Sequence, residues 1–117
     1  QALLIEDDPG VRDLVELFLG SLGMDVTSCS AEQEVLKLPN YDFDIIVSDV
    51  MLASGKTGPD LVRGIRSKRP EIACLFISGY KHRALSNEDL THPKTDFLAK
   101  PFSKSEFGKR VQTLLDL

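Results

Sequence analysis

The chain has 117 residues, 42% of them hydrophobic and 27% charged, which is enough for one globular domain with a single core and too little for two. Its 14 Lys and Arg against 18 Asp and Glu give a net charge of −4 without a basic cluster, which argues against direct nucleic-acid binding by this segment. Because no apolar run approaches the roughly 20 residues of a membrane span and no signal peptide precedes the first predicted strand, we expect no membrane insertion by this segment and a cytoplasmic location. Cys29 and Cys74 are then expected to be buried, reduced thiols.

The first half of the chain alternates apolar strands with amphipathic helices. Asp8-Pro9 is typical of a helix start, and the apolar stripe that follows it ends at Gly23. Residues 30–33 form a capping-box pattern, which predicts that a second, shorter helix opens there. The elements predicted in this half are a strand over 2–5, a helix from Pro9 to Gly23, a strand over 25–29, a helix from the capping box to Pro39, and a strand over 45–49.

The second half continues the alternation. A loop of small residues over 53–58 precedes Pro59, which starts a helix that must end before Pro70. A fully apolar strand covers 73–77, and a polar, weakly periodic helix is predicted over 81–90. The remaining elements are a strand over 96–99, a capping box over 103–106, and a last helix whose buried face carries Phe107, Val111, Leu114 and Leu115.

Polar residues stand at the ends of several predicted strands. Five strand–helix alternations with short connections predict a parallel sheet covered by helices on both sides, as one domain over residues 1–117. Ligands bind such sheets beyond the carboxyl ends of the strands. The residues expected to meet at that edge are Asp7, Asp8, Asp49, Ser78 and Lys100.

The expected meeting of three carboxylates has a chemical consequence. At about 4 Å and an effective dielectric of about 20, each pair of negative charges repels by roughly 4 kcal/mol, so either one acid is protonated or a cation is bound. Oxygen ligands in an open polar site favour Mg²⁺. A lysine and a hydroxyl beside a metal-bound carboxylate can receive a phosphoryl group, with the carboxylate as nucleophile.

At these motifs the sequence resembles, over its whole length, the receiver domain of two-component response regulators. The motifs that carry the resemblance are residues 4–8, 46–51, 76–80 and 97–102. The resemblance implies a flavodoxin-like three-layer fold with sheet order 2-1-3-4-5 and a cis peptide bond between Lys100 and Pro101. It also implies a phosphoacceptor domain of a phosphorelay, which as an isolated domain catalyses only its own phosphotransfer and dephosphorylation.

The resemblance further assigns roles to individual residues. Asp49 resembles the phosphoacceptor, and Ser78 and Lys100 resemble the hydroxyl and the ammonium that contact the phosphoryl group. Asp7, Asp8, Asp49 and the backbone carbonyl of Met51 are implied to hold Mg²⁺. Phe97 matches the aromatic residue whose burial tracks phosphorylation, and Ser78 moves with it as the switch hydroxyl.

The loop after Asp49 departs from the commonest family pattern. Ala53 stands where many receivers have proline, and the loop to Gly58 is one residue longer, a form similar to receivers attached to hybrid sensor histidine kinases. Met51 and Tyr80 flank the expected path of an attacking water, so we expect them to slow hydrolysis of the acyl phosphate.

The resemblance implies a histidine kinase or a histidine phosphotransfer protein as the phosphodonor, and an effector domain or protein as the partner that reads the switch. It is compatible with a monomer or a phosphorylation-dependent dimer. Two other classes remain as alternatives. One is a docking module of the same fold that is never phosphorylated. The other is a phosphatase with an Asp nucleophile, which lacks room for a cap domain in 117 residues.

Overall fold

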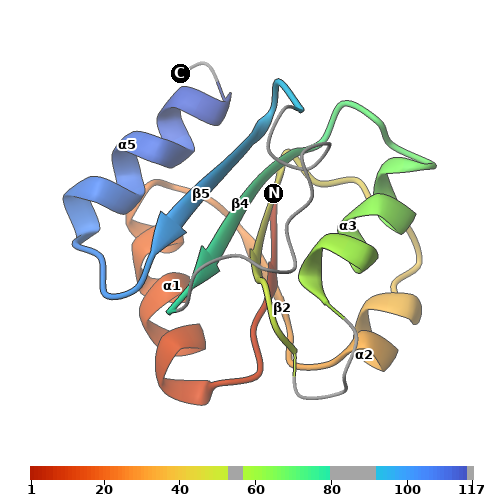
Figure 1. Ribbon diagram of the computed structural model, residues 1–117, viewed down its shortest axis with the longest axis horizontal. Coiled ribbons are helices and arrows are strands. Elements are labelled where there is room, and N and C mark those ends of the chain that lie inside the picture. The colour runs from red at the N-terminus through yellow and green to blue at the C-terminus, as the bar shows by residue number, and fades with distance from the viewer. Residues whose placement is uncertain (53–56, 80–91, 116–117) are drawn as a thin grey trace.

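The computed structural model describes residues 1–52, 57–79 and 92–115 (Figure 1). The strands are β1 (Ala2–Ile5), β2 (Val26–Cys29), β3 (Ile45–Asp49), β4 (Ala73–Ser78) and β5 (Thr95–Ala99). The helices are α1 (Pro9–Ser21), α2 (Glu32–Leu36), α3 (Gly58–Arg66) and α5 (Lys104–Leu115). The helix predicted over 81–90 lies outside the described residues, as do Ala53 and Tyr80.

All five strands pair in parallel in one sheet, in the order β2-β1-β3-β4-β5. Every residue of β1 and β4 is buried, and so is β3 up to Ser48, which explains why these strands read as unbroken apolar runs. The implied sheet order is therefore confirmed. The peptide bond between Lys100 and Pro101 is cis, as the resemblance implied.

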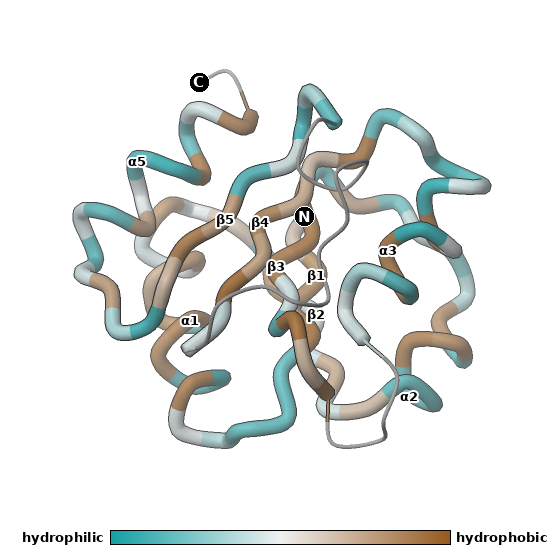
Figure 2. The backbone as a smooth tube through the Cα atoms, in the orientation of Figure 1, coloured by the Kyte–Doolittle hydropathy of each residue, from teal (hydrophilic) through white to brown (hydrophobic). Residues whose placement is uncertain are grey.

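Two of the described helices cover each face of the sheet. α1 and α5 pack on one face, where Val15, Leu19 and Phe107 are buried with alternate residues of the central strands. α2 and α3 pack on the other face, where Val35 and Leu61 are buried with the strand residues that point to that side. Figures 1 and 2 show this arrangement, with the apolar strands between the two helix pairs. None of the described helices has the length and apolar character needed to cross a membrane.

Of the three side-chain caps that the sequence predicts, at Asp8, Ser30 and Ser103, two formed as expected. Oδ1 of Asp8 caps α1 by accepting from the amides of Gly10 and Val11, at 2.9 and 3.2 Å. The capping box before α5 is complete, because Ser103 and Glu106 each accept from the other's backbone amide at 3.1 Å.

The predicted capping box before α2 does not form. The N-cap residue is Ala31, which has no side chain that can cap. Ser30 instead donates from its backbone amide and its hydroxyl to Oε1 of Glu34, one turn into the helix. The Ser30 hydroxyl therefore serves a carboxylate in the helix rather than the free amides at its start.

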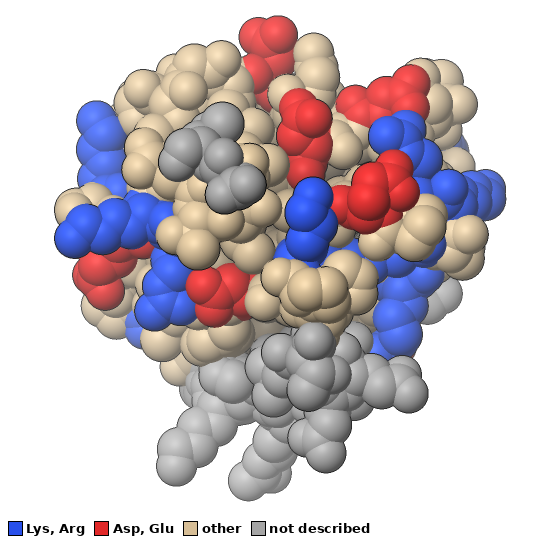
Figure 3. All heavy atoms as spheres, turned by 90° about the horizontal axis from the view of Figure 1, so that it is seen from above, with Lys and Arg blue, Asp and Glu red and all other residues tan. Residues whose placement is uncertain are grey.

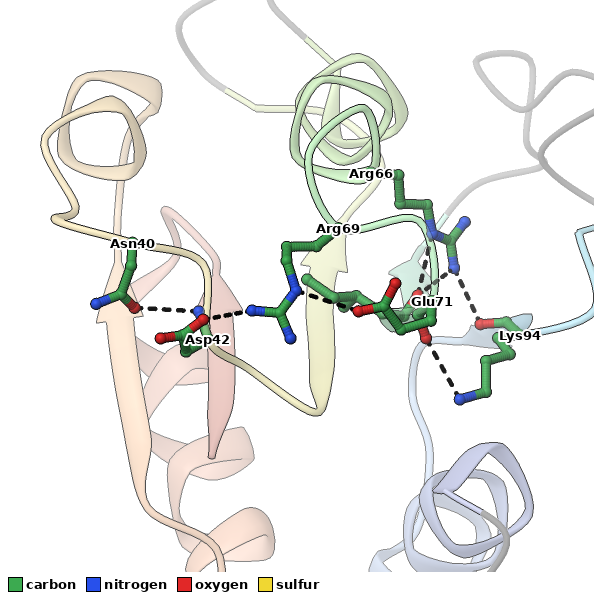
Figure 4. A network of polar contacts seen from close by, with 7 residues as sticks. Asn40, Asp42, Arg66, Arg69, Glu71 and Lys94 are labelled. Atoms are coloured by element: carbon green, nitrogen blue, oxygen red, sulfur yellow. Dashed lines mark hydrogen bonds and ion pairs between the residues drawn. The ribbon is translucent and has the colours of Figure 1, made fainter.

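Different side chains lie at the two ends of the strands. Figure 3 looks down on the end of the molecule where β4 and β5 begin, and there acidic and basic side chains lie next to one another. A network of ion pairs and hydrogen bonds joins several of them, with Arg66 and Arg69 at its centre (Figure 4). The opposite edge, where the strands end, carries the residues of the candidate site.

Candidate functional site

Three carboxylates meet where β1 and β3 end. Glu6 and Asp7 follow β1, and Asp49 is the last residue of β3. One oxygen from each of these three side chains lies within 4.8 Å of the others. Glu6 is fully buried, and its amide still donates to the Cys29 carbonyl at 3.0 Å, so the chain leaves the sheet only after this residue.

Lys100, the residue directly after β5, joins this cluster. Its Nζ donates to Oε1 of Glu6 at 2.9 Å and lies 3.6 Å from Oδ2 of Asp49. The side chains of Lys100 and Asp49 are 23% and 15% exposed, so both reach solvent from a largely protected position. The amide of Lys100 donates to the Ser78 carbonyl at 2.8 Å, which fixes the start of the lysine relative to β4.

Burial and neighbouring charges set the protonation of the pair at the centre of the cluster. Burial raises the pKa of Glu6 from 4.5 to about 7; the hydrogen bond from Lys100 opposes that rise, and Asp49 adds to it. Burial alone would lower the pKa of Lys100, but its hydrogen bond to Glu6 and the charge of Asp49 outweigh burial and raise it. Lys100 therefore stays charged at neutral pH, while Glu6 holds its proton unusually tightly.

The cluster suits a hard divalent cation. Oε2 of Glu6 is buried and has no hydrogen-bond partner among the described residues, which costs free energy unless another group binds that oxygen. Among the described residues, three carboxylates face one ammonium, so this group is negative when all its members are ionised. A cluster of carboxylate oxygens that is open to solvent on one side fits the ligand preference of Mg²⁺.

The structure differs from the sequence interpretation at one acid. Asp8 is not among the three acids whose side-chain oxygens lie together; its described side-chain contacts are those of the helix cap. Glu6 lies with Asp7 and Asp49 instead, and the sequence interpretation gives Glu6 no role. Of three consecutive acids after a strand, the first continues the sheet and is buried at the edge. Its position next to Ile5 was the available signal.

The remaining predicted residues lie around the cluster at different depths. Ser78 is the last residue of β4, buried, and opposite Ala99 in β5. Phe97 pairs with Phe76 and is half-buried against the core cluster on the α3 side of the sheet. Met51 is 55% exposed and bridges Thr57 across the loop that precedes α3. The position predicted for Tyr80 lies outside the described residues.

Comparison with known proteins identifies the family. The sequence model of the response regulator receiver domain matches residues 2–112, so the chain belongs to this family. It is a receiver domain of the phosphoacceptor family of two-component signalling.

Among curated proteins, the chain is 33% identical to sensor kinase CckA of Brucella abortus, over 97% of this chain and 12% of that protein. It is 30% identical to the response regulator protein PilR of Pseudomonas aeruginosa, over 100% of this chain and 26% of that protein. The chain thus spans only about a quarter of PilR and about an eighth of CckA.

Solved receiver structures share the fold over the whole domain. The receiver (REC) domain of the PhyR response regulator from Erythrobacter litoralis matches with a TM-score of 0.82 and 26% identity, covering 100% of this chain and 90% of that one. The non-phosphorylated HemR receiver domain from Leptospira biflexa matches with a TM-score of 0.78 and 30% identity, covering 99% of this chain and 94% of that one.

Proposed function

We propose that Asp49 accepts a phosphoryl group from a phosphohistidine of a partner protein, in a reaction that requires Mg²⁺. The observation that carries this proposal is the convergence of Glu6, Asp7, Asp49 and Lys100 at one edge of the sheet. A carboxylate oxygen of Asp49 attacks phosphorus, the bond from phosphorus to the imidazole nitrogen of the donor breaks, and Asp49 becomes an acyl phosphate. The imidazole leaves with the electron pair of that bond.

Each neighbour of Asp49 has a distinct part in this reaction. Lys100, which already lies 3.6 Å from Asp49, pairs with the oxygens of the arriving phosphoryl group. Ser78 donates its hydroxyl hydrogen to another of those oxygens. Glu6, Asp7, Asp49 and the carbonyl of Met51 are the proposed Mg²⁺ ligands. Mg²⁺ bound there neutralises part of the negative charge that otherwise repels the phosphoryl group.

Phosphorylation is then read out through Ser78 and Phe97. Ser78 moves toward the phosphoryl group, and Phe97, half-buried two residues before the end of β5, turns further inward. A local change in charge thereby changes the outer surface of β5, which an effector can bind. The ring signals of Phe97 in NMR should shift on phosphorylation in the wild type and stay in place in Ser78→Ala. Equal shifts in both proteins would contradict this coupling.

The exposed face of α1 is the proposed docking site for the phosphodonor. Leu14 and Leu17 are 42% and 68% exposed, although both are large and apolar. α1 begins directly after the acidic cluster, so a partner that places its phosphohistidine over Asp49 can also cover these side chains.

The test uses a small phosphodonor in place of the partner. Wild-type protein incubated with Mg²⁺ and acetyl phosphate should gain the mass of one phosphoryl group, and Asp49→Asn should gain none. No gain in the wild type would favour the docking module. Continuous release of phosphate from many substrates would favour the phosphatase.

A further inference from the structure

The first residue of α3 lies so close to the backbone of Asp49 that only glycine fits there. A Cβ atom on Gly58 would lie 2.0 Å from the carbonyl oxygen of Asp49 and 2.6 Å from Oγ of Ser48. The first of these atoms belongs to the backbone, so a change of side-chain rotamer cannot relieve the clash. A Cβ on Gly64, in the same helix, would meet nothing within 4 Å, so α3 itself does not require glycine.

Hydrogen bonds hold this close approach in place. The amide of Gly58 donates to the Val50 carbonyl at 2.8 Å, and the Ser48 hydroxyl donates to the Asp49 carbonyl at 2.9 Å. Ser48 is fully buried, so its hydroxyl does not exchange this bond for water. We call these contacts among Ser48, Asp49, Val50 and Gly58 the Gly58 latch.

The latch bears directly on the direction of the Asp49 side chain. The carbonyl that it holds and the carboxylate that accepts phosphorus both leave from the Cα atom of Asp49. Movement of that carbonyl therefore changes the backbone torsions of Asp49 and Val50. It also changes the 3.6 Å distance between Oδ2 of Asp49 and Nζ of Lys100. The same movement displaces Met51, the next residue after the latch on this side of the loop.

We propose that Gly58 is a positioning residue for phosphoryl transfer, which acts by fixing the backbone of Asp49 through the latch. This inference rests on the proposed function. Transfer requires the attacking oxygen in line with phosphorus, and a misplacement of about 1 Å can reduce a rate by about a hundredfold. A side chain at position 58 must displace either the start of α3 or the end of β3.

Four variants test this role. The first-order rate constant of phosphorylation is measured at saturating Mg²⁺ and acetyl phosphate, and Mg²⁺ affinity is measured separately by NMR titration. Gly58→Ala should reduce the rate constant by about tenfold to a hundredfold in a protein that still folds. Gly64→Ala introduces the same methyl group in the same helix and should match the wild type. Ile65→Val lowers stability in α3 without touching the latch, so its rate constant should also match.

Ser48→Ala covers the case in which Gly58→Ala does not fold. It removes one hydroxyl, adds no atom, and should reduce the rate constant by about twofold to tenfold through the lost hydrogen bond. A wild-type rate in folded Gly58→Ala, or in Ser48→Ala if the first variant is unfolded, overturns the latch and leaves the proposed function intact. If wild-type protein gains no phosphoryl group, the proposed function fails and the role of Gly58 fails with it.

Discussion

Glu6 holds the innermost place in the acidic cluster, and its environment decides when it is charged. The carboxyl is fully buried, one oxygen accepts a hydrogen bond from Lys100, and the other has no partner in the described part of the chain. Its pKa is 4.5 in an unfolded chain and about 7 in the folded protein, so the folded protein holds this proton more tightly. The resulting contribution to stability is complete below pH 4.5 and is lost as the pH rises toward 7.

This shift makes a prediction for Glu6→Gln in the presence of EDTA. Gln cannot ionise, so between about pH 4.5 and 7 the free energy of unfolding of the variant should rise relative to the wild type, by about 3 kcal/mol at most. Urea unfolding at several pH values measures the difference. A difference that does not vary with pH would show that Glu6 titrates normally. Excess Mg²⁺ should reduce the pH dependence of the wild type, because a bound cation favours the carboxylate.

Lys100 contributes one positive charge to the same cluster. Removing that charge should change the Mg²⁺ affinity and the phosphorylation rate in opposite directions. In Lys100→Gln, Mg²⁺ should bind about tenfold more tightly, because a positive charge that contacts Glu6 and Asp49 is gone. Phosphorylation by acetyl phosphate should nevertheless slow by about a hundredfold, because a donor to the phosphoryl oxygens is lost. Lys109→Gln on α5 makes the same charge change and serves as the control. Weaker Mg²⁺ binding in Lys100→Gln would contradict this account.

At the scale of elements, one arginine joins the end of α3 to the starts of β4 and β5. Arg66 donates from Nε and Nη2 to the Ile72 carbonyl and from Nη1 to the Thr95 hydroxyl, over 2.7–3.1 Å. Its Nη2 also donates to the Lys94 carbonyl at 3.1 Å (Figure 4). These bonds bring together segments that are distant in sequence, at the edge of the sheet opposite Asp49. Only the planar, branched guanidinium can serve all three acceptors.

Arg66→Lys should therefore lower the free energy of unfolding by about 1 to 3 kcal/mol, because a single ammonium cannot replace this set of bonds. Arg63→Lys, in the same helix, alters a side chain that is 45% exposed and should change stability by less than about 1 kcal/mol. Urea denaturation of both variants measures the comparison. Equal losses would show that Arg66 has no special role.

The sequence was most informative about elements and least informative about local contacts. The central strands were predicted because a buried parallel strand leaves a continuous apolar run, as in Ile45–Asp49. The sequence did not show which of the three adjacent acids after β1 enters the site. That depends on the residue at which the chain leaves the sheet, and strand propensity does not define this residue. The cap of α2 was also not predictable, because the Ser30 hydroxyl can bind either the Glu34 carboxylate or the free amides of the first turn, and it binds the carboxylate. The Gly58 latch could not be predicted from the sequence, because it joins residues on either side of a loop, and only the folded structure shows that they are in contact.

At the scale of the whole molecule, the site and the stability of the domain are coupled. A cation that binds only the folded protein stabilises it, by about 2.7 kcal/mol at a concentration one hundred times its dissociation constant. Mg²⁺ should therefore raise the melting temperature of the wild type, and Asp7→Asn should lose most of that increase. Asp13→Asn, which neutralises an exposed acid on α1, should keep it. An equal increase in all three proteins would place the Mg²⁺ elsewhere.

The most direct measurement locates the phosphoryl group on the chain. Protein phosphorylated with acetyl phosphate and Mg²⁺ is reduced with borohydride, which converts an aspartyl phosphate to the corresponding alcohol, and the peptides are sequenced by mass spectrometry. Our account predicts one modified residue, Asp49, in a Mg²⁺-dependent reaction. Modification at any other residue, or an equal yield in EDTA, would contradict it.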